Sequence, residues 1–144
     1  MYKSLKDILK YVVAKAPVVV AASTPCAGFK GNDFGAVTHL VMAGANTGTA
    51  LAAGHKIDIV MQHSDVDVDG SYANCVDADI YNAEVGASGI VKSIDATEDA
   101  NQIYPCHYRG VKPYSRVRLV VTGSPSVTMA VATLGGYPEL NPPL

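Results

Sequence analysis

The stretch SRVRLVVTG, residues 115–123, alternates charged or polar residues with apolar ones. Successive side chains of an extended chain point to opposite faces, so Arg116 and Arg118 fall together on one face. Val117 and Leu119 fall on the other face. A strand of this kind has one side in a core and one side in water. The stretch therefore predicts a half-buried β-strand that ends at a glycine turn.

Five other stretches share this short, β-branched character, and Gly, Pro, Asn, Asp or Ser residues bound them. They are APVVVAAS (16–23), FGAVTHLVMAG (34–44), HKIDIVMQHS (55–64), NQIYPCHY (101–108) and SVTMAVATLGG (126–136). Strands of this length and spacing are typical of an all-β sandwich or barrel. Strands and helices do not alternate, which argues against a parallel α/β fold. We therefore expect an all-β fold, an antiparallel β-sandwich or jelly-roll-like domain.

Two internal segments have a different character. Residues 36–43 are almost uniformly apolar, which predicts a central strand that is covered on both faces. Residues 77–100 have only short apolar runs, around Ile80 and at residues 90–91. For this region we expect a long excursion with one or two minor strands.

Residues 4–14, SLKDILKYVVA, give the one helical signal. Apolar residues recur at i, i+3, i+4, i+7 and i+8, which places them on one helix face. The residues of that face are Leu5, Ile8, Leu9, Val12 and Val13. Ser4 and Asp7 resemble a capping box, and Pro17 prevents the helix from continuing. We therefore expect a short N-terminal helix.

The last residues, GGYPELNPPL, are rich in proline. Pro138, Pro142 and Pro143 lack an N–H group and so exclude a helix or a paired central strand. An extended C-terminal arm is expected instead, either disordered or laid on a neighbouring chain, and we favour the neighbour. The apolar side chains of this arm are Tyr137, Leu140 and Leu144.

The 144 residues suffice for one domain with its own core. We divide the chain into an N-terminal helical arm (1–15), a β-sandwich domain (16–135) and a C-terminal arm (136–144). Charged residues make up only 17% of the chain, which hints at a surface partly covered by other chains. A net charge of -2 offers no basic face, so we expect no nucleic-acid partner. The absence of a long apolar run and of a signal-peptide pattern predicts no membrane association.

Cysteine and histidine residues form no recognisable catalytic motif. Cys26, Cys75 and Cys106 are far apart, so we expect buried thiols in a reduced environment. His39 lies in an apolar run and is expected to be a core histidine with satisfied hydrogen bonds. Cys106 and His107 are neighbours on an expected strand and therefore point to opposite faces. A remote Cys–His pair stays open, but we expect no enzyme and no cofactor.

The stretch MQHSDVDVDGSYANCVD, residues 61–77, resembles half of a calcium loop. Asp65, Asp67, Asp69 and the following glycine fit the first six positions of an EF-hand. The twelfth position is Val76, which cannot coordinate an ion, and the flanking residues are strand-like. The pattern therefore favours a β-hairpin turn with an acidic rim. The three aspartates stay weak candidates for a calcium site of another kind.

Two stretches together resemble a known family. They are IVMQHSDVDVDGSYANCVDADI, residues 59–80, and YPCHYRGVKPYSRVRLVVTGSPSVTMAVATLGGYP, residues 104–138. With a leader of the SLKDIL kind, this arrangement is similar to small virion proteins of tailed bacteriophages, of the capsid decoration or cement type. The chain departs from the family pattern at Pro113 and at Asp67 with Val68, which lengthens the acidic turn.

The resemblance implies a non-enzymatic protein on the outer surface of a phage head, assembled in the host cytoplasm, which stabilises the capsid. Its partners would be the major capsid protein and further copies of itself, most simply as a homotrimer at local three-fold axes. The residues expected to make contacts are Leu5, Ile8, Leu9, Val12, Arg109, Lys112, Arg116, Arg118, Tyr137, Leu140 and Leu144.

Two other functions stay open from the sequence. One is a head–tail connector or tail-tube component of the phage particle, since such proteins are also small, all-β and extended by arms. The other is a soluble β-sandwich module that binds carbohydrate or calcium. The chain has no Trp, but its eight Tyr residues keep a glycan site in consideration.

Overall fold

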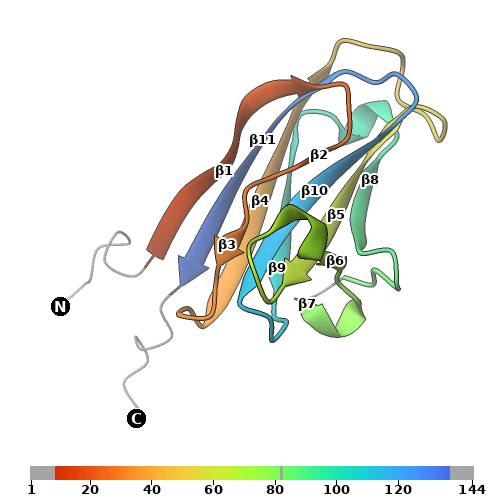
Figure 1. Ribbon diagram of the computed structural model, residues 1–144. Coiled ribbons are helices and arrows are strands. Elements are labelled where there is room, and N and C mark those ends of the chain that lie inside the picture. The colour runs from red at the N-terminus through yellow and green to blue at the C-terminus, as the bar shows by residue number, and fades with distance from the viewer. Residues whose placement is uncertain (1–8, 82, 137–144) are drawn as a thin grey trace.

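The structure is a computed structural model, and it describes residues 9–81 and 83–136. Two antiparallel sheets pack together, which confirms the predicted all-β fold and is consistent with a sandwich (Figure 1). The first sheet has the order β1-β11-β4-β9-β7. Its strands are β1 (Leu9–Val20), β11 (Val127–Gly136), β4 (Ala36–Asn46), β9 (Gln102–Tyr108) and β7 (Ile80–Tyr81). The jelly-roll connectivity stays a prediction.

The second sheet is built around β10 and β5, and short strands pair along both of them. Its strands are β2 (Thr24–Pro25), β3 (Phe29–Lys30), β5 (Lys56–Ser64), β6 (Ala73–Asn74), β8 (Ile90–Ile94) and β10 (Tyr114–Thr122). In the described part of the chain, three single-turn 3₁₀ helices lie in the connections: η2 (Asp69–Ser71), η3 (Asp77–Asp79) and η4 (Thr97–Asp99). The expected minor strands of the 77–100 region are β7 and β8.

Besides β1, the long strands β4, β5, β9, β10 and β11 lie where the sequence predicts them. β4 is central in its sheet, as expected, but only one of its faces is fully buried, and Leu40 and Met42 on the other face are partly exposed. The expectation of full cover on both faces is therefore wrong for β4. It applies to β5 instead, where residues 57–62 are all buried.

The predicted helix over residues 4–14 is wrong from Leu9 onward, because β1 runs from Leu9 to Val20 and pairs with β11. The proposed domain boundary at residue 15 falls inside this strand. The register shifts on both sides of Lys15, before pairing resumes at Val18. Pro17 lies in that irregular part, where a missing N–H group is tolerated, as expected for proline in an edge strand. Long-range pairing of a valine-rich segment overrides its helical spacing.

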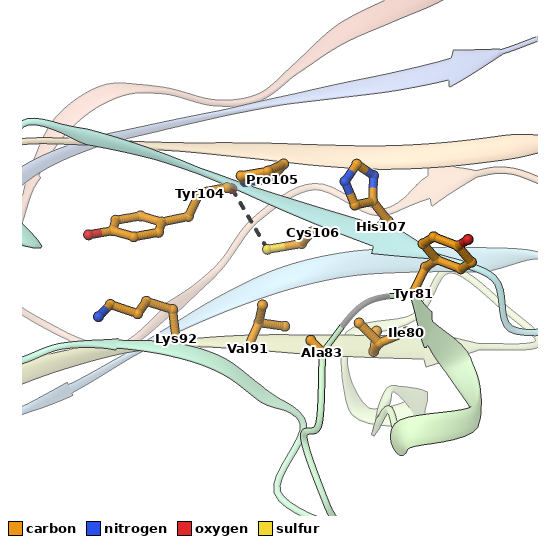
Figure 2. A pocket seen from close by; sticks show the side chains of 9 residues that line it. All are labelled: Ile80, Tyr81, Ala83, Val91, Lys92, Tyr104, Pro105, Cys106 and His107. Atoms are coloured by element: carbon orange, nitrogen blue, oxygen red, sulfur yellow. Dashed lines mark hydrogen bonds between the residues drawn. The ribbon is translucent and has the colours of Figure 1, made fainter.

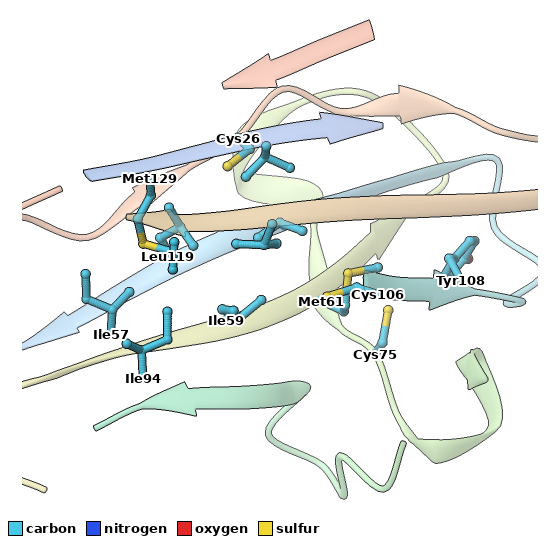
Figure 3. Packing of buried hydrophobic residues seen from close by; sticks show 14 of the residues in the cluster. Cys26, Ile57, Ile59, Met61, Cys75, Ile94, Cys106, Tyr108, Leu119 and Met129 are labelled. Atoms are coloured by element: carbon cyan, nitrogen blue, oxygen red, sulfur yellow. The ribbon is translucent and has the colours of Figure 1, made fainter. Parts of the chain in front are cut away.

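Apolar side chains of both sheets fill the space between them (Figure 3). β5 contributes Ile57, Ile59 and Met61, and the facing sheet contributes Val41 and Val131, each 0% exposed. Burial of one such side chain stabilises the fold by about 1.5–3 kcal/mol. The alternation seen in residues 115–123 is confirmed in part on β10, because Val117 and Leu119 face this core and Arg118 faces water, whereas Arg116 is buried.

His39 of β4 is a core histidine, as predicted, and it connects the two sheets. Its side chain is 0% exposed. The Nδ1 atom lies 2.8 Å from the Thr133 hydroxyl of β11, and the Nε2 atom lies 2.9 Å from the Ser115 hydroxyl of β10. Burial lowers the pKa of His39 to about 4, so the ring is neutral at pH 7.

The three cysteines are free and buried, as predicted. Burial raises the pKa of Cys26 to about 11 and the pKa of Cys75 and Cys106 to about 12. All three are therefore neutral thiols at pH 7, and a neutral thiol is a poor nucleophile. They act here as small apolar side chains of the core.

Candidate functional site

Strand β1 presents a row of large apolar side chains to solvent on both of its faces, because neighbouring side chains of a strand point to opposite faces. They are Tyr11 (70% exposed), Val12 (37%), Val13 (70%), Val18 (45%) and Val19 (51%). Single exposed apolar residues are common on any protein, but a row along one strand is typical of a surface that binds another molecule. We call β1 with these five side chains the β1 edge.

The backbone of β1 is also available for binding. In the sheet order of the described residues β1 is the first strand, with β11 as its neighbour, and Figure 1 shows it at the margin of the molecule. At the middle of the strand the carbonyl of Ala14 accepts a hydrogen bond from the Ala27 N–H (3.0 Å). An edge strand offers unpaired N–H and C=O groups that a further strand can use. The β1 edge therefore combines apolar and hydrogen-bonding surface.

Leu9 and Val12, two of the predicted contact residues, lie on this edge, although on a strand and not on a helix face. The other apolar contact residues lie outside the described part of the chain. They are Leu5, Ile8, Tyr137, Leu140 and Leu144.

The aspartates of the acidic turn each have a separate partner. Asp65 Oδ2 accepts a hydrogen bond from the Lys112 ammonium at 2.7 Å, and Asp67 Oδ1 accepts one from the Tyr72 hydroxyl at 2.7 Å. Asp69 binds a third group, an arginine. Asp65 and Asp69 therefore tie the acidic turn to residues of other segments, whereas the Asp67 bond to Tyr72 lies within the turn itself.

Arg116 is the partner of Asp69, and its side chain is only 6% exposed. Nη1 donates to Asp69 Oδ1 at 2.6 Å, and Nε donates to Gln62 Oε1 at 3.0 Å. The guanidinium also stacks on the Tyr72 ring, 3.9 Å from its centroid. Arg116 is thus buried and paired within the chain, which argues against its predicted role as a contact residue.

The remaining predicted cations lie nearer the surface. Arg118 is exposed on β10, and Arg109 is exposed after β9. Arg109 Nε donates to the Ala78 carbonyl at 3.0 Å, and its guanidinium lies 5.7 Å from the centroid of the Tyr81 ring. Lys112 is half-buried in its ion pair with the acidic turn. Their role as contacts stays a prediction.

A second cluster lies at the end of β5. His63 of β5, Cys75 just after β6 and Asp79 of η3 bring their ligand atoms within 4.8 Å of one another. His63 Nδ1 lies 3.8 Å from Asp79 Oδ2 and 3.2 Å from the Tyr108 hydroxyl. Across residues 9–81 and 83–136, this is the one group of three or more His, Cys, Asp or Glu side chains that could hold a metal ion, so the acidic turn is not such a group.

This His–Cys–carboxylate cluster lacks the properties of a catalytic triad. A nucleophilic cysteine needs a lowered pKa, but burial raises the pKa of Cys75 to about 12 and Asp79 raises it further. Burial also lowers the pKa of His63, which outweighs the opposite effect of Asp79. The cluster therefore does not favour the thiolate–imidazolium pair that nucleophilic catalysis requires.

The spacing of the three residues explains why sequence analysis missed the cluster. His63 and Cys75 are separated by the whole acidic loop, and Asp79 follows four residues after the cysteine. No recurrent metal motif has this spacing. Only the pairing of β6 with the end of β5 brings them together.

A pocket of about 310 Å³ opens between β9 and the β7–β8 segment (Figure 2). Ile80, Tyr81, Ala83, Val91, Lys92, Tyr104, Pro105, Cys106 and His107 line it. Lys92 pairs with Asp99 at 2.7 Å and lies 5.9 Å from the Tyr104 ring centroid. Because Lys92 is already paired and the Cys106 thiol is neutral, the pocket shows no catalytic arrangement.

No family model, curated protein or solved structure matches this chain. The resemblance to phage virion proteins that the sequence suggests therefore stays an expectation from residues 59–80 and 104–138. Within the described residues, no helix has the length and hydropathy to cross a lipid bilayer.

Proposed function

We propose that this protein is a non-enzymatic structural protein of a tailed-phage virion, a capsid decoration or cement protein that binds the outer surface of the head. The β1 edge is the observation that supports this proposal best. The turn-and-strand pattern of residues 59–80 and 104–138 supports the choice of a phage virion, and the sandwich fold is compatible with it.

The β1 edge fits the physical task of a cement protein. Such a protein must bind many identical sites on a lattice, and its affinity can come from one extended contact repeated over all copies. A partner strand added to β1 would gain backbone hydrogen bonds and cover the apolar row, including Tyr11 and Val13. Assembly of the copies as trimers would add avidity, so that each single contact can be modest.

The occupancy of phage heads tests the proposal. Heads that lack the protein are mixed with the purified wild-type chain or with a Val13→Glu, Val19→Glu double variant, and bound copies are counted after sedimentation. Both substituted side chains are at least half exposed, so the variant should keep its fold. We expect at least tenfold weaker binding, because charges on this edge cannot be buried against a partner.

Val111→Glu is the matched control, because Val111 is 97% exposed and lies outside β1. This control should bind as the wild type does. Equal binding by the β1 variant would refute the role of β1, while failure of the wild type to bind any head would refute the virion assignment. Labelling at a single ring at the head–tail junction, and not across the head, would favour the connector alternative.

A further inference from the structure

The cluster of His63, Cys75 and Asp79 has the composition of a transition-metal site. It offers one imidazole nitrogen, one sulfur and one carboxylate oxygen, a set that suits Zn²⁺ and disfavours Ca²⁺ and Mg²⁺, which prefer oxygen ligands alone. On binding the ion, Cys75 would release its proton to solvent, and its thiolate and the Asp79 carboxylate would then supply two negative charges, which balance a divalent cation. Nearby Asp65 and Lys112 neutralise each other in an ion pair.

The geometry of the cluster is close to that of a zinc site. With metal–ligand distances of about 2.0–2.3 Å and tetrahedral angles, two ligands of one zinc ion lie roughly 3.3–3.8 Å apart. The His63 Nδ1 to Asp79 Oδ2 distance is 3.8 Å, and all ligand atoms lie within 4.8 Å of one another. Side-chain rotations that move an atom by about 1 Å would therefore suffice to enclose an ion.

The surroundings hold the ligands in place. Asp79 Oδ2 accepts a hydrogen bond from the Val76 N–H at 3.0 Å, which fixes the carboxylate at the end of η3. The ring of His63 meets the Tyr108 ring edge-on, with centroids 5.9 Å apart. Cys75 is 0% exposed, and its N–H donates to the Met61 carbonyl at 2.9 Å. Figure 3 shows Cys75 beside Met61 and near Tyr108 at this end of the core.

We propose that His63, Cys75 and Asp79 bind one zinc ion, with a water molecule or the Tyr108 oxygen as the fourth ligand. The ion would tie the end of β5 to the loop that carries β6 and η3. Its role is structural, since it would add a cross-link to the pairing of β6 with the end of β5. The site is separate from the β1 edge and does not depend on the proposed function.

Cobalt and zinc titrations of the full chain test this site. The purified protein is freed of metal with a chelator and titrated with Co²⁺, which gives a thiolate-to-cobalt absorption band when cysteine is a ligand. We expect one equivalent of Co²⁺ to bind with this band, and Zn²⁺ to displace it. Cys75→Ser should abolish the band, and His63→Gln and Asp79→Asn should each weaken binding at least tenfold.

Two matched controls use residues of the same types elsewhere in the fold. Cys26→Ser changes another buried cysteine, and His107→Gln changes a histidine that hydrogen-bonds with Thr38, so both should retain the cobalt band. Zinc at about a hundred times its Kd should raise the melting temperature of the wild type by roughly 5–10 °C. The same zinc should raise the melting temperature of Asp79→Asn by at most about half as much, because its binding is at least tenfold weaker.

Asp79→Asn keeps an oxygen that can accept the Val76 N–H, so this variant should fold even if the cysteine variant does not. Absence of a cobalt–thiolate band in the wild type would overturn the proposal. So would a band that survives Cys75→Ser, or a zinc-induced rise in melting temperature that is equal in Asp79→Asn. In those cases the cluster is only a hydrogen-bonded part of the core.

Discussion

At the scale of single residues, the buried polar side chains determine how the two sheets are arranged and how the stability of the fold depends on pH. His39 has both ring nitrogens engaged, one with each sheet, and it is fully buried. Arg116 is buried beside Gln62, although its carboxylate partner Asp69 is 78% exposed. A buried polar group of this kind is costly to leave unpaired, so these contacts specify one arrangement of the sheets.

The burial of His39 predicts that acid destabilises the fold. The folded-state pKa is about 4, whereas an unperturbed histidine titrates near 6.5. Between these pH values the unfolded chain binds a proton that the folded chain does not, so stability falls as the pH falls. At up to about 1.4 kcal/mol per pH unit, the loss from this residue reaches roughly 3 kcal/mol at pH ~4. Urea unfolding as a function of pH measures it.

Substitution isolates the contribution of this histidine. His39→Gln should be less stable at neutral pH but should lose the extra pH dependence between about 6.5 and 4. His107→Gln is the control and should keep the wild-type slope, because its side chain lies outside the core. An unchanged slope in His39→Gln would show that other groups cause the acid response.

At the scale of elements, backbone contacts determine which segments pair with β5 along the side that does not face β10. β8 pairs with the first half of β5 and β6 with its end. Met61 lies between them, where its N–H donates to the Gly89 carbonyl and its carbonyl accepts from the Cys75 N–H. This arrangement places Cys75 next to His63 and so creates the metal-ligand cluster.

Gly89 is essential for this arrangement. Its φ is +69°, and a Cβ atom there would lie 2.8 Å from the Met61 carbonyl oxygen and 3.1 Å from the Asn74 Cβ. We expect Gly89→Ala to destabilise the protein by roughly 2–4 kcal/mol, because rigid backbone must move. Denaturant unfolding at neutral pH measures the difference.

Gly86 provides the matched control for this glycine. It also has a positive φ, of +55°, but a Cβ atom there would meet nothing within 4 Å. Gly86→Ala should therefore cost only about 1 kcal/mol, from backbone conformation alone. Equal effects of the two substitutions would show that close packing at Gly89 is unimportant.

Elements with clear period-two patterns were predictable from the sequence, as the strands containing Val117 and Met129 show. The N-terminal segment was not, because Leu9, Val12 and Val13 satisfy a helical spacing, and only pairing with β11 decides against it. The cluster around Cys75 was equally hidden, since it depends on long-range strand pairing and not on local spacing. The burial of Arg116 could not be inferred from alternation, which assigned it to the solvent face.

At the scale of the whole molecule, the surface is sparsely charged and its most distinctive feature is apolar. A decoration protein that binds through the β1 edge would depend on area and strand pairing more than on charge. The exposed Arg118 would then contribute little.

The salt dependence of binding to phage heads tests whether apolar area and strand pairing contribute more to binding than charge does. Binding to phage heads should change by less than about threefold between roughly 50 mM and 500 mM salt, since screening weakens only exposed charge pairs. Arg118→Glu should weaken binding only slightly. A steep loss of binding with salt, together with a large effect of Arg118→Glu, would show that the cationic residues make the contact and the β1 edge does not.

The irregular middle of β1 has a consequence for the free protein in solution. A long, flat, apolar edge strand can pair with further copies of the same protein without limit, and such growth gives fibrils. Here Pro17 removes one donor, the register breaks on both sides of Lys15, and Ala14 already accepts a bond from within the chain. An incoming strand can therefore pair with only one short half at a time. The edge that we propose as the binding surface is thus protected against self-propagating strand addition in the free protein.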